Sequence, residues 1–160
     1  MRPNTGGWIV RLLAALLLTV FAPGMVRAET SPALLVQPGV GVGYIRIGES
    51  REDLLAALGA SETEAGVLDN KDEVFQYWSK KLTVLVRAGK VFSIDCLNPN
   101  YRTAGGVGVG STISEVESAL GSTYERKQGG VGPELSYASG IRFLCMDDRV
   151  LGIEVRAPSK

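Results

Sequence analysis

The most reactive side chains in this chain, two cysteines, lack the partners that thiol catalysis needs. Cys96 and Cys145 lie far apart, and the 160 residues include no histidine. Ser-His-Asp and Cys-His arrangements are therefore excluded, and no C-x-x-C spacing points to a redox thiol. Too few cysteines and histidines are present for a structural zinc site. The sequence thus predicts no catalytic, metal-binding or cofactor-binding residue, and a protein that is not an enzyme.

The two cysteines are instead candidates for a structural role. Each ends a run of alternating apolar residues, so we expect both side chains to point inward. If their strands adjoin in one sheet, a disulfide between Cys96 and Cys145 would close a loop of about 50 residues and contribute roughly 4 kcal/mol. The alternative is a pair of buried free thiols that pack as small hydrophobes. The sequence leaves both open.

Two other groups of residues resemble ligand-binding motifs without meeting their requirements. The glycine runs 39–43 and 105–110 have neither the lysine of a P-loop nor dinucleotide-binding spacing, so we interpret each as a structural entry strand. The acidic residues of the loop after the first predicted helix lack calcium-loop spacing, which favours a solvated loop. These acids are Glu62, Glu64, Asp69, Asp72 and Glu73.

Four aromatic residues are candidates for contact with a partner. Tyr77 and Trp78 precede a predicted strand, where alternation buries one of the two and turns the other outward. Tyr101 and Tyr124 fall in predicted loops. An exposed aromatic side chain is a common anchor in protein interfaces, whereas ordinary packing is the alternative use of all four.

The elements that would position these residues can be predicted from pattern. Short helices are expected after Ser50 and after Thr112, because each is an N-cap residue with an acid three positions later. Gly59 and Gly121 fit the ends of these helices. Alternating apolar residues predict one β-hairpin over 82–96 and another over 141–155. Helices this short must pack on a sheet to be stable.

The elements occur twice in the same order. The segment ending Leu58-Gly59 aligns with the one ending Leu120-Gly121 at an offset of 62, and the hairpins, with Trp78 opposite Tyr137, align at 59. This pattern predicts an internal repeat. We therefore expect an α+β fold of two tandem strand-helix-hairpin repeats, with an antiparallel sheet and short helices packed on one face. The expected boundaries are a flexible leader at 29–42, repeat 1 at 43–98 and repeat 2 at 99–160.

The N-terminus has the features of a cleavable signal peptide over residues 1–28. Arg2 and Arg11 supply positive charge ahead of an apolar run from Leu12 to Met25. Val26 and Ala28 are small residues at positions −3 and −1 of a cleavage site before Glu29. The run is shorter than the roughly 20 residues of a membrane-spanning helix, so cleavage is favoured over an uncleaved anchor. No later stretch is apolar enough to span a membrane. The predicted location is periplasmic or secreted.

Charge narrows the choice of partner. Of the 17 basic residues three lie in the signal peptide, so 14 remain against 17 acids, a net charge of −3. A nucleic-acid-binding protein would carry a clustered basic face, so we expect no nucleic acid as a partner.

The turn glycines, capped helix and hairpin resemble a known family. The segment from Gly48 through Leu58-Gly59 and Tyr77-Trp78 to Gly89-Lys90-Val91 resembles the small outer-membrane-assembly lipoprotein (SmpA/OmlA-like) domain. Two such units in tandem resemble the β-lactamase inhibitory protein. The resemblance implies non-enzymatic binding of protein partners in the cell envelope or outside the cell. The chain departs from it in lacking the lipid-attachment cysteine and in having Ala60 and Ser122 where proline is common.

The prediction for function is therefore an exported, non-catalytic protein-interaction module of the bacterial cell envelope or secreted space. The partner would meet the open sheet face or the loops at 61–73, 97–104 and 122–134. The alternatives are a secreted enzyme inhibitor and a small-molecule or glycan-binding protein that uses the concave sheet. An envelope hydrolase is disfavoured, and a cleft holding two close carboxylates would restore it.

Overall fold

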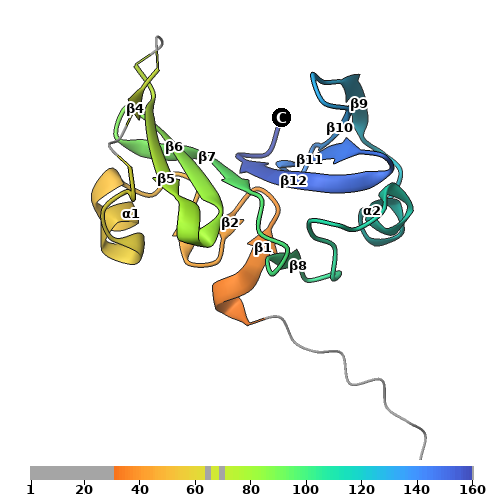
Figure 1. The fold of residues 1–160 in the computed structure, drawn as a ribbon, viewed down its shortest axis with the longest axis horizontal. Helices are drawn as coiled ribbons and strands as arrows, with labels where there is room; N and C mark the ends of the chain where they lie inside the picture. The colour runs from red at the N-terminus through yellow and green to blue at the C-terminus, as the bar shows by residue number, and fades with distance from the viewer. Residues whose placement is uncertain (1–30, 64–65, 69–70, 160) are drawn as a thin grey trace, which may run out of the picture.

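A computed structural model describes residues 31–63, 66–68 and 71–159. The predicted signal peptide at 1–28 lies outside the described residues. The described chain forms two antiparallel-rich sheets and two short α-helices, so the predicted α+β class holds in outline, with strands dominating (Figure 1). Among these residues, no helix has the length and apolar character needed to cross a membrane.

The larger sheet has eight strands, all antiparallel, in the order β4-β5-β6-β7-β12-β11-β10-β9. Both predicted hairpins are confirmed, as β6–β7 and β11–β12. The strands are β4 (Gly66–Val67), β5 (Glu73–Tyr77), β6 (Leu82–Arg87), β7 (Lys90–Cys96), β9 (Glu125–Gln128), β10 (Pro133–Tyr137), β11 (Ile141–Met146) and β12 (Arg149–Arg156).

The pairing of β7 with β12 joins the two halves of this sheet. Ile94 lies opposite Val155, and Cys96 lies opposite Ile153. Between these pairs, Asp95 lies opposite Glu154. An offset of 59 relates Asp95 to its own partner Glu154, and it relates the pair Ile94–Val155 to the pair Ile153–Cys96. This is the register of a twofold-symmetric contact. Asp95 and Glu154 sit where the axis would pass.

Two helices cover the flanks of one sheet face. Helix α1 (Arg51–Leu58) and helix α2 (Ile113–Leu120) both begin with a complete capping box, formed by Ser50 with Asp53 and by Thr112 with Glu115. Each ends at a glycine with positive φ, as predicted. Figure 1 shows the helices beside the two wings of the sheet, on the same side of it.

A smaller sheet covers the middle of the same face. It has the order β3-β2-β1-β8, with β1 (Leu35–Gln37), β2 (Gly41–Val42), β3 (Ile45–Arg46) and β8 (Arg102–Thr103), and follows the short 3₁₀ helix η1 (Pro32–Leu34). Residues 31–42 were expected to be a flexible leader and instead build this sheet, because Val36 and Val42 fill the core. The glycine run 105–110 forms turns rather than the expected entry strand.

One face of the eight-stranded sheet is consequently buried and the other open. Alternate residues of the six inner strands, β5, β6, β7, β12, β11 and β10, point into the core. Leu54 of α1 and Val116 of α2 pack over them. The fully buried members with the largest volumes are Tyr77, Phe75, Phe143, Ile45, Leu54, Ile94, Leu135, Ile141 and Ile153. Neither helix nor small sheet lies on the opposite face, whose side chains form the candidate site.

Candidate functional site

A row of polar residues crosses the open face from one side of the large sheet to the other. Each member lies directly opposite the next in the strand register, and all but the last are half-buried. Outward-facing positions of half-exposed strands are usually polar, but an unbroken row of ionisable and hydrogen-bonding groups is a surface with its own chemistry. From β5 to β9 its members are Gln76, Thr83, Asp95, Glu154, Arg142, Ser136 and Glu125.

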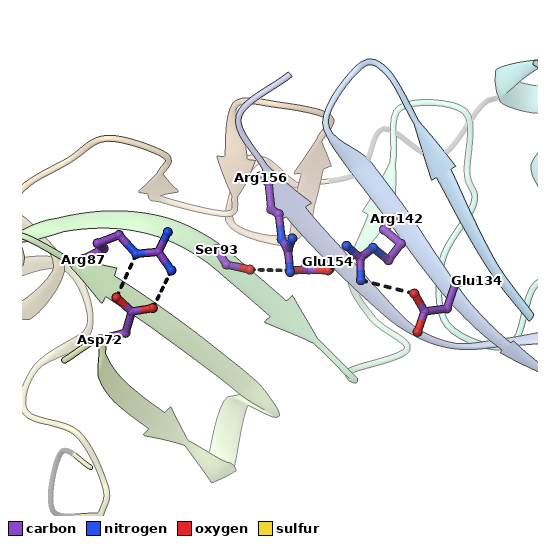
Figure 2. A network of polar contacts seen from close by, with 7 residues as sticks. All are labelled: Asp72, Arg87, Ser93, Glu134, Arg142, Glu154 and Arg156. Atoms are coloured by element: carbon purple, nitrogen blue, oxygen red, sulfur yellow. Dashed lines mark hydrogen bonds and ion pairs between the residues drawn. The ribbon is translucent and has the colours of Figure 1, made fainter. Parts of the chain in front are cut away.

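Glu154 is the best-satisfied member of this row. Its carboxylate forms ion pairs with Arg142, at 3.3 Å, and with Arg156. It also accepts a hydrogen bond of 2.7 Å from the hydroxyl of Ser93. Only 13% of its side chain is exposed. Arg142 is shared with Glu134 at 3.2 Å. Figure 2 shows Arg142 between the two glutamates, with Ser93 and Arg156 on the other side of Glu154.

Asp95, opposite Glu154, has none of these partners. Within the described part of the chain it forms no ion pair and accepts no hydrogen bond. Burial raises the pKa of Asp95 to about 6, and the negative charge of Glu154 adds to the rise, while Arg156 and Arg142 act in the opposite direction. Like charges directly opposite on paired strands are unfavourable, so this pair is maintained at a cost in stability.

A hollow of about 330 Å³ lies over this pair of carboxylates. Asp95, Glu134 and Glu154 line it with Arg142, and Leu97 and Leu144 form apolar walls. The Leu97 side chain lies across Gly152, where a Cβ atom would come within 2.8 Å of its Cδ2. A second hollow of about 360 Å³ continues over β9–β12 and is lined by Lys127, Arg156 and Ser159 among others.

The two halves of the open face differ in character. Strands β5–β7 contribute Val74, Leu85 and Phe92, which alternate with core residues and remain half-exposed. The guanidinium of Arg87 lies over the ring of Phe92, 4.2 Å from the ring centre. The half formed by β10–β12 contributes the charged network instead. Protein interfaces combine an apolar core with a polar rim, and this face offers both kinds of surface.

The four predicted aromatic residues divide between core and surface. Tyr77 and Tyr101 are buried, so neither is available to a partner in the folded protein. Trp78 begins the 3₁₀ helix η2 (Trp78–Lys80) and is 60% exposed, as alternation predicts for one of the pair. Tyr124 is half-buried and donates a 2.6 Å hydrogen bond to Glu117.

The expected match of Trp78 to Tyr137 is displaced by one residue. The hydroxyl of Tyr77 donates to the carbonyl of Gly59 at 3.2 Å, and that of Tyr137 donates to the carbonyl of Gly121 at 2.8 Å. Both tyrosines therefore tie the end of a helix to the adjacent sheet, and Tyr77 is the counterpart of Tyr137.

The cysteines are free thiols rather than a disulfide. Both are buried, and burial raises the pKa of Cys96 to about 11 and also raises that of Cys145. Strand β12 lies between their strands β7 and β11. Two strand spacings of about 4.8 Å exceed the reach of a disulfide, whose Cα atoms lie within about 7 Å. The inward orientation of both side chains was predicted from alternation. The position of β12 between their strands could not be predicted, because it depends on pairing between distant segments.

The acidic loop is tied to its surroundings. Asp72 is buried and pairs with Arg87 at 2.6 Å, Glu73 pairs with Arg51 at 3.0 Å, and Glu62 accepts hydrogen bonds from Ser79. Glu64 and Asp69 lie outside the described residues. Across the described ranges, no three or more Cys, Asp and Glu side chains are grouped so that they could hold a metal ion.

Sequence reasoning missed the residues that make up this site. Asp95, Glu154 and Arg142 each stand at an outward position of a predicted strand, so their exposure on one face follows from alternation. Their convergence depends on the pairing of β7 with β12, which joins segments far apart in the chain. The offset of 59 between Asp95 and Glu154 was the available signal.

Comparison with known proteins supports the fold. No protein-family model matches the sequence, and no curated protein matches it. The uncharacterized protein YfeY of Escherichia coli is similar in structure, with a TM-score of 0.53, 17% sequence identity, and coverage of 74% of this chain and 97% of that one. At this identity the likeness shows a shared fold alone.

Two further solved structures are more distant. A DUF4309 family protein, YjgB, of Bacillus subtilis has a TM-score of 0.47 and 15% identity over 68% of this chain and 78% of that one. An extracellular protein containing an SCP domain from Bacillus anthracis has a TM-score of 0.47 and 12% identity over 69% of this chain. The match spans 44% of the length of that protein.

Proposed function

We propose that this protein is an exported, non-catalytic interaction module that binds a protein partner through the open face of its eight-stranded sheet. The observation that carries the proposal is the uncovered face itself, which combines half-exposed apolar side chains with a charged network around Asp95 and Glu154. A specific inhibitor of a secreted enzyme is one form of this function. A periplasmic or secreted location is part of the proposal and rests on the predicted signal peptide.

We further propose that the two halves are tandem copies of one unit, related to the small outer-membrane-assembly lipoprotein domain. Two features favour this origin. Each half contains a capped helix, and the carbonyl of the glycine that ends the helix accepts a hydrogen bond from a tyrosine hydroxyl, that of Tyr77 or Tyr137. Each half also ends in a hairpin with a register shift at the matching place, at Leu85/Val86 and at Leu144/Cys145.

The interaction can be tested with a photo-crosslinking amino acid placed on either side of the molecule. Thr83 lies on the open face, and Ser118 is exposed on helix α2. Protein carrying the crosslinker at residue 83 should yield one discrete product in an envelope extract, and protein carrying it at residue 118 should not. Purified partner should then bind the wild type and lose affinity for Leu97→Asp. Equal products from both positions would contradict use of the sheet face.

Trp78→Ala tests whether the exposed tryptophan belongs to the same surface. Loss of affinity comparable to that of Leu97→Asp would extend the binding surface to η2. Unchanged affinity would confine it to the sheet and remove the aromatic residue from the proposal.

A glycoside hydrolase is the second candidate, because one observation favours it. Asp95 and Glu154 are two carboxyl groups on opposed strands, and the raised pKa of Asp95 beside a carboxylate paired with two arginines resembles an acid and its charged companion. The three donors that hold Glu154 oppose its use as a nucleophile. The test is hydrolysis of a panel of fluorogenic glycosides by the wild type and by Asp95→Asn. Hydrolysis by the wild type that is abolished in the variant would favour a glycoside hydrolase over an interaction module.

A further inference from the structure

The two carboxylates at the centre of the open face have matched positions and unmatched surroundings. Arg142 lies directly opposite Glu154 on the adjoining strand, and in the other half Thr83 lies directly opposite Asp95. Arg156 stands two residues after Glu154, and Leu97 stands two residues after Asp95. The same backbone framework therefore surrounds both acids.

The third neighbour follows the same rule. Ser93, two residues before Asp95, reaches across the strand pair to hydrogen-bond Glu154. The corresponding residue two positions before Glu154 is Gly152, which has no side chain to offer Asp95. All three donors around Glu154 are thus replaced around Asp95 by residues that form no hydrogen bond or ion pair with it in the described chain.

This difference leaves Asp95 without a direct donor in the described chain, although Arg142 and Arg156 act on it through space. The hollow over Asp95 is lined by three carboxylates and only one guanidinium, Arg142, which is shared by Glu134 and Glu154. An unpaired carboxylate in a half-buried position opposes folding. Asparagine or threonine would fill the position without that cost, so the acid is better explained by a partner than by the fold.

The walls of the hollow indicate the form of the missing group. Leu97, 55% exposed, and Leu144 flank the carboxylates. An arginine or lysine side chain has an apolar stem that packs on such walls and a cationic end. At about 330 Å³ the hollow is at the lower limit of ligand pockets, and a single long side chain suits it.

We propose that Asp95 is the acceptor for a basic side chain, arginine in preference to lysine, presented by the protein partner. The stem of that side chain would lie between Leu97 and Leu144, and its guanidinium would supply to Asp95 the donors that Arg142, Arg156 and Ser93 supply to Glu154. Arginine is preferred because its planar, five-donor group can bridge two carboxylates. This inference rests on the proposed function, since it names the chemistry of the partner at the same face.

The proposal can be tested without the partner, using a small probe on the full chain after signal cleavage. Nα-acetyl-arginine amide is titrated into ¹⁵N-labelled protein at low ionic strength, and Nα-acetyl-citrulline amide serves as the uncharged probe of the same shape. The expected result is saturable shifts of the amide signals of β7 and β12 near Asp95 with arginine, at least five-fold smaller with citrulline. The Asp95 carboxyl should also titrate at lower pH when arginine is present.

Two variants make the result specific. Asp95→Asn keeps the side-chain shape and removes the charge, and it should abolish the arginine-dependent shifts. Glu52→Gln removes one carboxylate from an exposed position of helix α1, which lies on the other side of the sheet, and it should leave the shifts unchanged. Dispersed amide spectra for both variants establish that each remains folded.

The outcomes separate this inference from the proposed function. Absence of shifts, equal shifts with citrulline, or shifts retained in Asp95→Asn would overturn the inference, even if the open face captures a protein partner in the crosslinking experiment. Arginine-specific shifts that depend on Asp95 would support it, including where crosslinking finds no partner, which would count against the proposed function alone.

Discussion

At the scale of single residues, the open face contains two acids in opposite electrostatic states. Glu154 is surrounded by three donors, whereas Asp95 faces a like charge and a partly apolar hollow. These environments predict that removing one charge stabilises the fold and removing the other destabilises it. The opposite signs distinguish this arrangement from a general excess of surface charge.

Replacement of Asp95 by asparagine should stabilise the protein in a pH-dependent way. Because the folded state raises the pKa of Asp95 to about 6, the native state binds more protons than the unfolded state between about pH 4 and pH 6, and wild-type stability falls as pH rises through that range. Asp95→Asn should therefore gain on the order of 1–2 kcal/mol at pH 7, allowing for solvent screening. Urea unfolding at pH 7 and pH 4 measures the difference, which should vanish at pH 4.

Glu154→Gln should have the reverse effect on stability and should lower the pKa of Asp95. The change leaves Arg142 and Arg156 without their shared acceptor, at a cost on the order of 1 kcal/mol. It also removes the charge that helps to raise the pKa of Asp95. Carboxyl ¹³C shifts followed over pH measure that pKa directly. An unchanged value would show that Glu154 does not act on Asp95.

The thiols give a third prediction at this scale. Cys96 and Cys145 are buried and separated by strand β12. Ellman's reagent should therefore titrate almost no thiol in the native protein and both thiols after unfolding in denaturant without reductant. Recovery of no thiols under the second condition would mean that the two cysteines are bonded to each other.

At the scale of elements, the capped helices are the features most clearly set by local sequence. Ser50 and Thr112, each with an acid three residues later, form both bonds of a capping box. The β-hairpins also follow from local alternation and turn residues. The small sheet does not, since β1 and β2 have only three and two residues and β1 is stabilised by pairing with the distant strand β8 rather than by propensity.

Removing either cap should cost about 1 kcal/mol. Ser50→Ala and Thr112→Ala each leave a helix N-terminal N–H group without its side-chain acceptor. Since the two helices lie at opposite flanks of the sheet, the losses should add within a few tenths of a kcal/mol in the double variant. Midpoints of urea unfolding measure all three values, and strong non-additivity would indicate coupling between the helices.

At the scale of the whole molecule, the β7–β12 pairing makes one sheet from two sequential sets of strands. Local pattern predicts each set, and the candidate site arises only where they meet. This explains why the sequence yields the strands and the face of Asp95 and Glu154 but not their apposition. It also explains why Cys96 and Cys145 face the core together without meeting.

This seam should make unfolding cooperative. Ile94 is completely buried on β7 and lies opposite Val155. Ile94→Ala should lower the free energy of unfolding by about 2–4 kcal/mol, while the protein continues to unfold in one transition. Calorimetry tests this through agreement of the calorimetric and van't Hoff enthalpies. Two resolved transitions would show that the halves unfold separately.

The position of β12 as the last strand also determines when folding can finish. Strands β5–β7 are consecutive in the chain and can pair as soon as they exist, but β7 gains its second neighbour only when residues 149–156 become available. During synthesis residues 93–96 of β7 are therefore an unpaired edge, and the apolar side chains of Ile94 and Cys96 lie beside free N–H and C=O groups. Such edges template aggregation. We expect the yield of native protein to depend more on how quickly β12 pairs with β7 than on the stability of the folded protein.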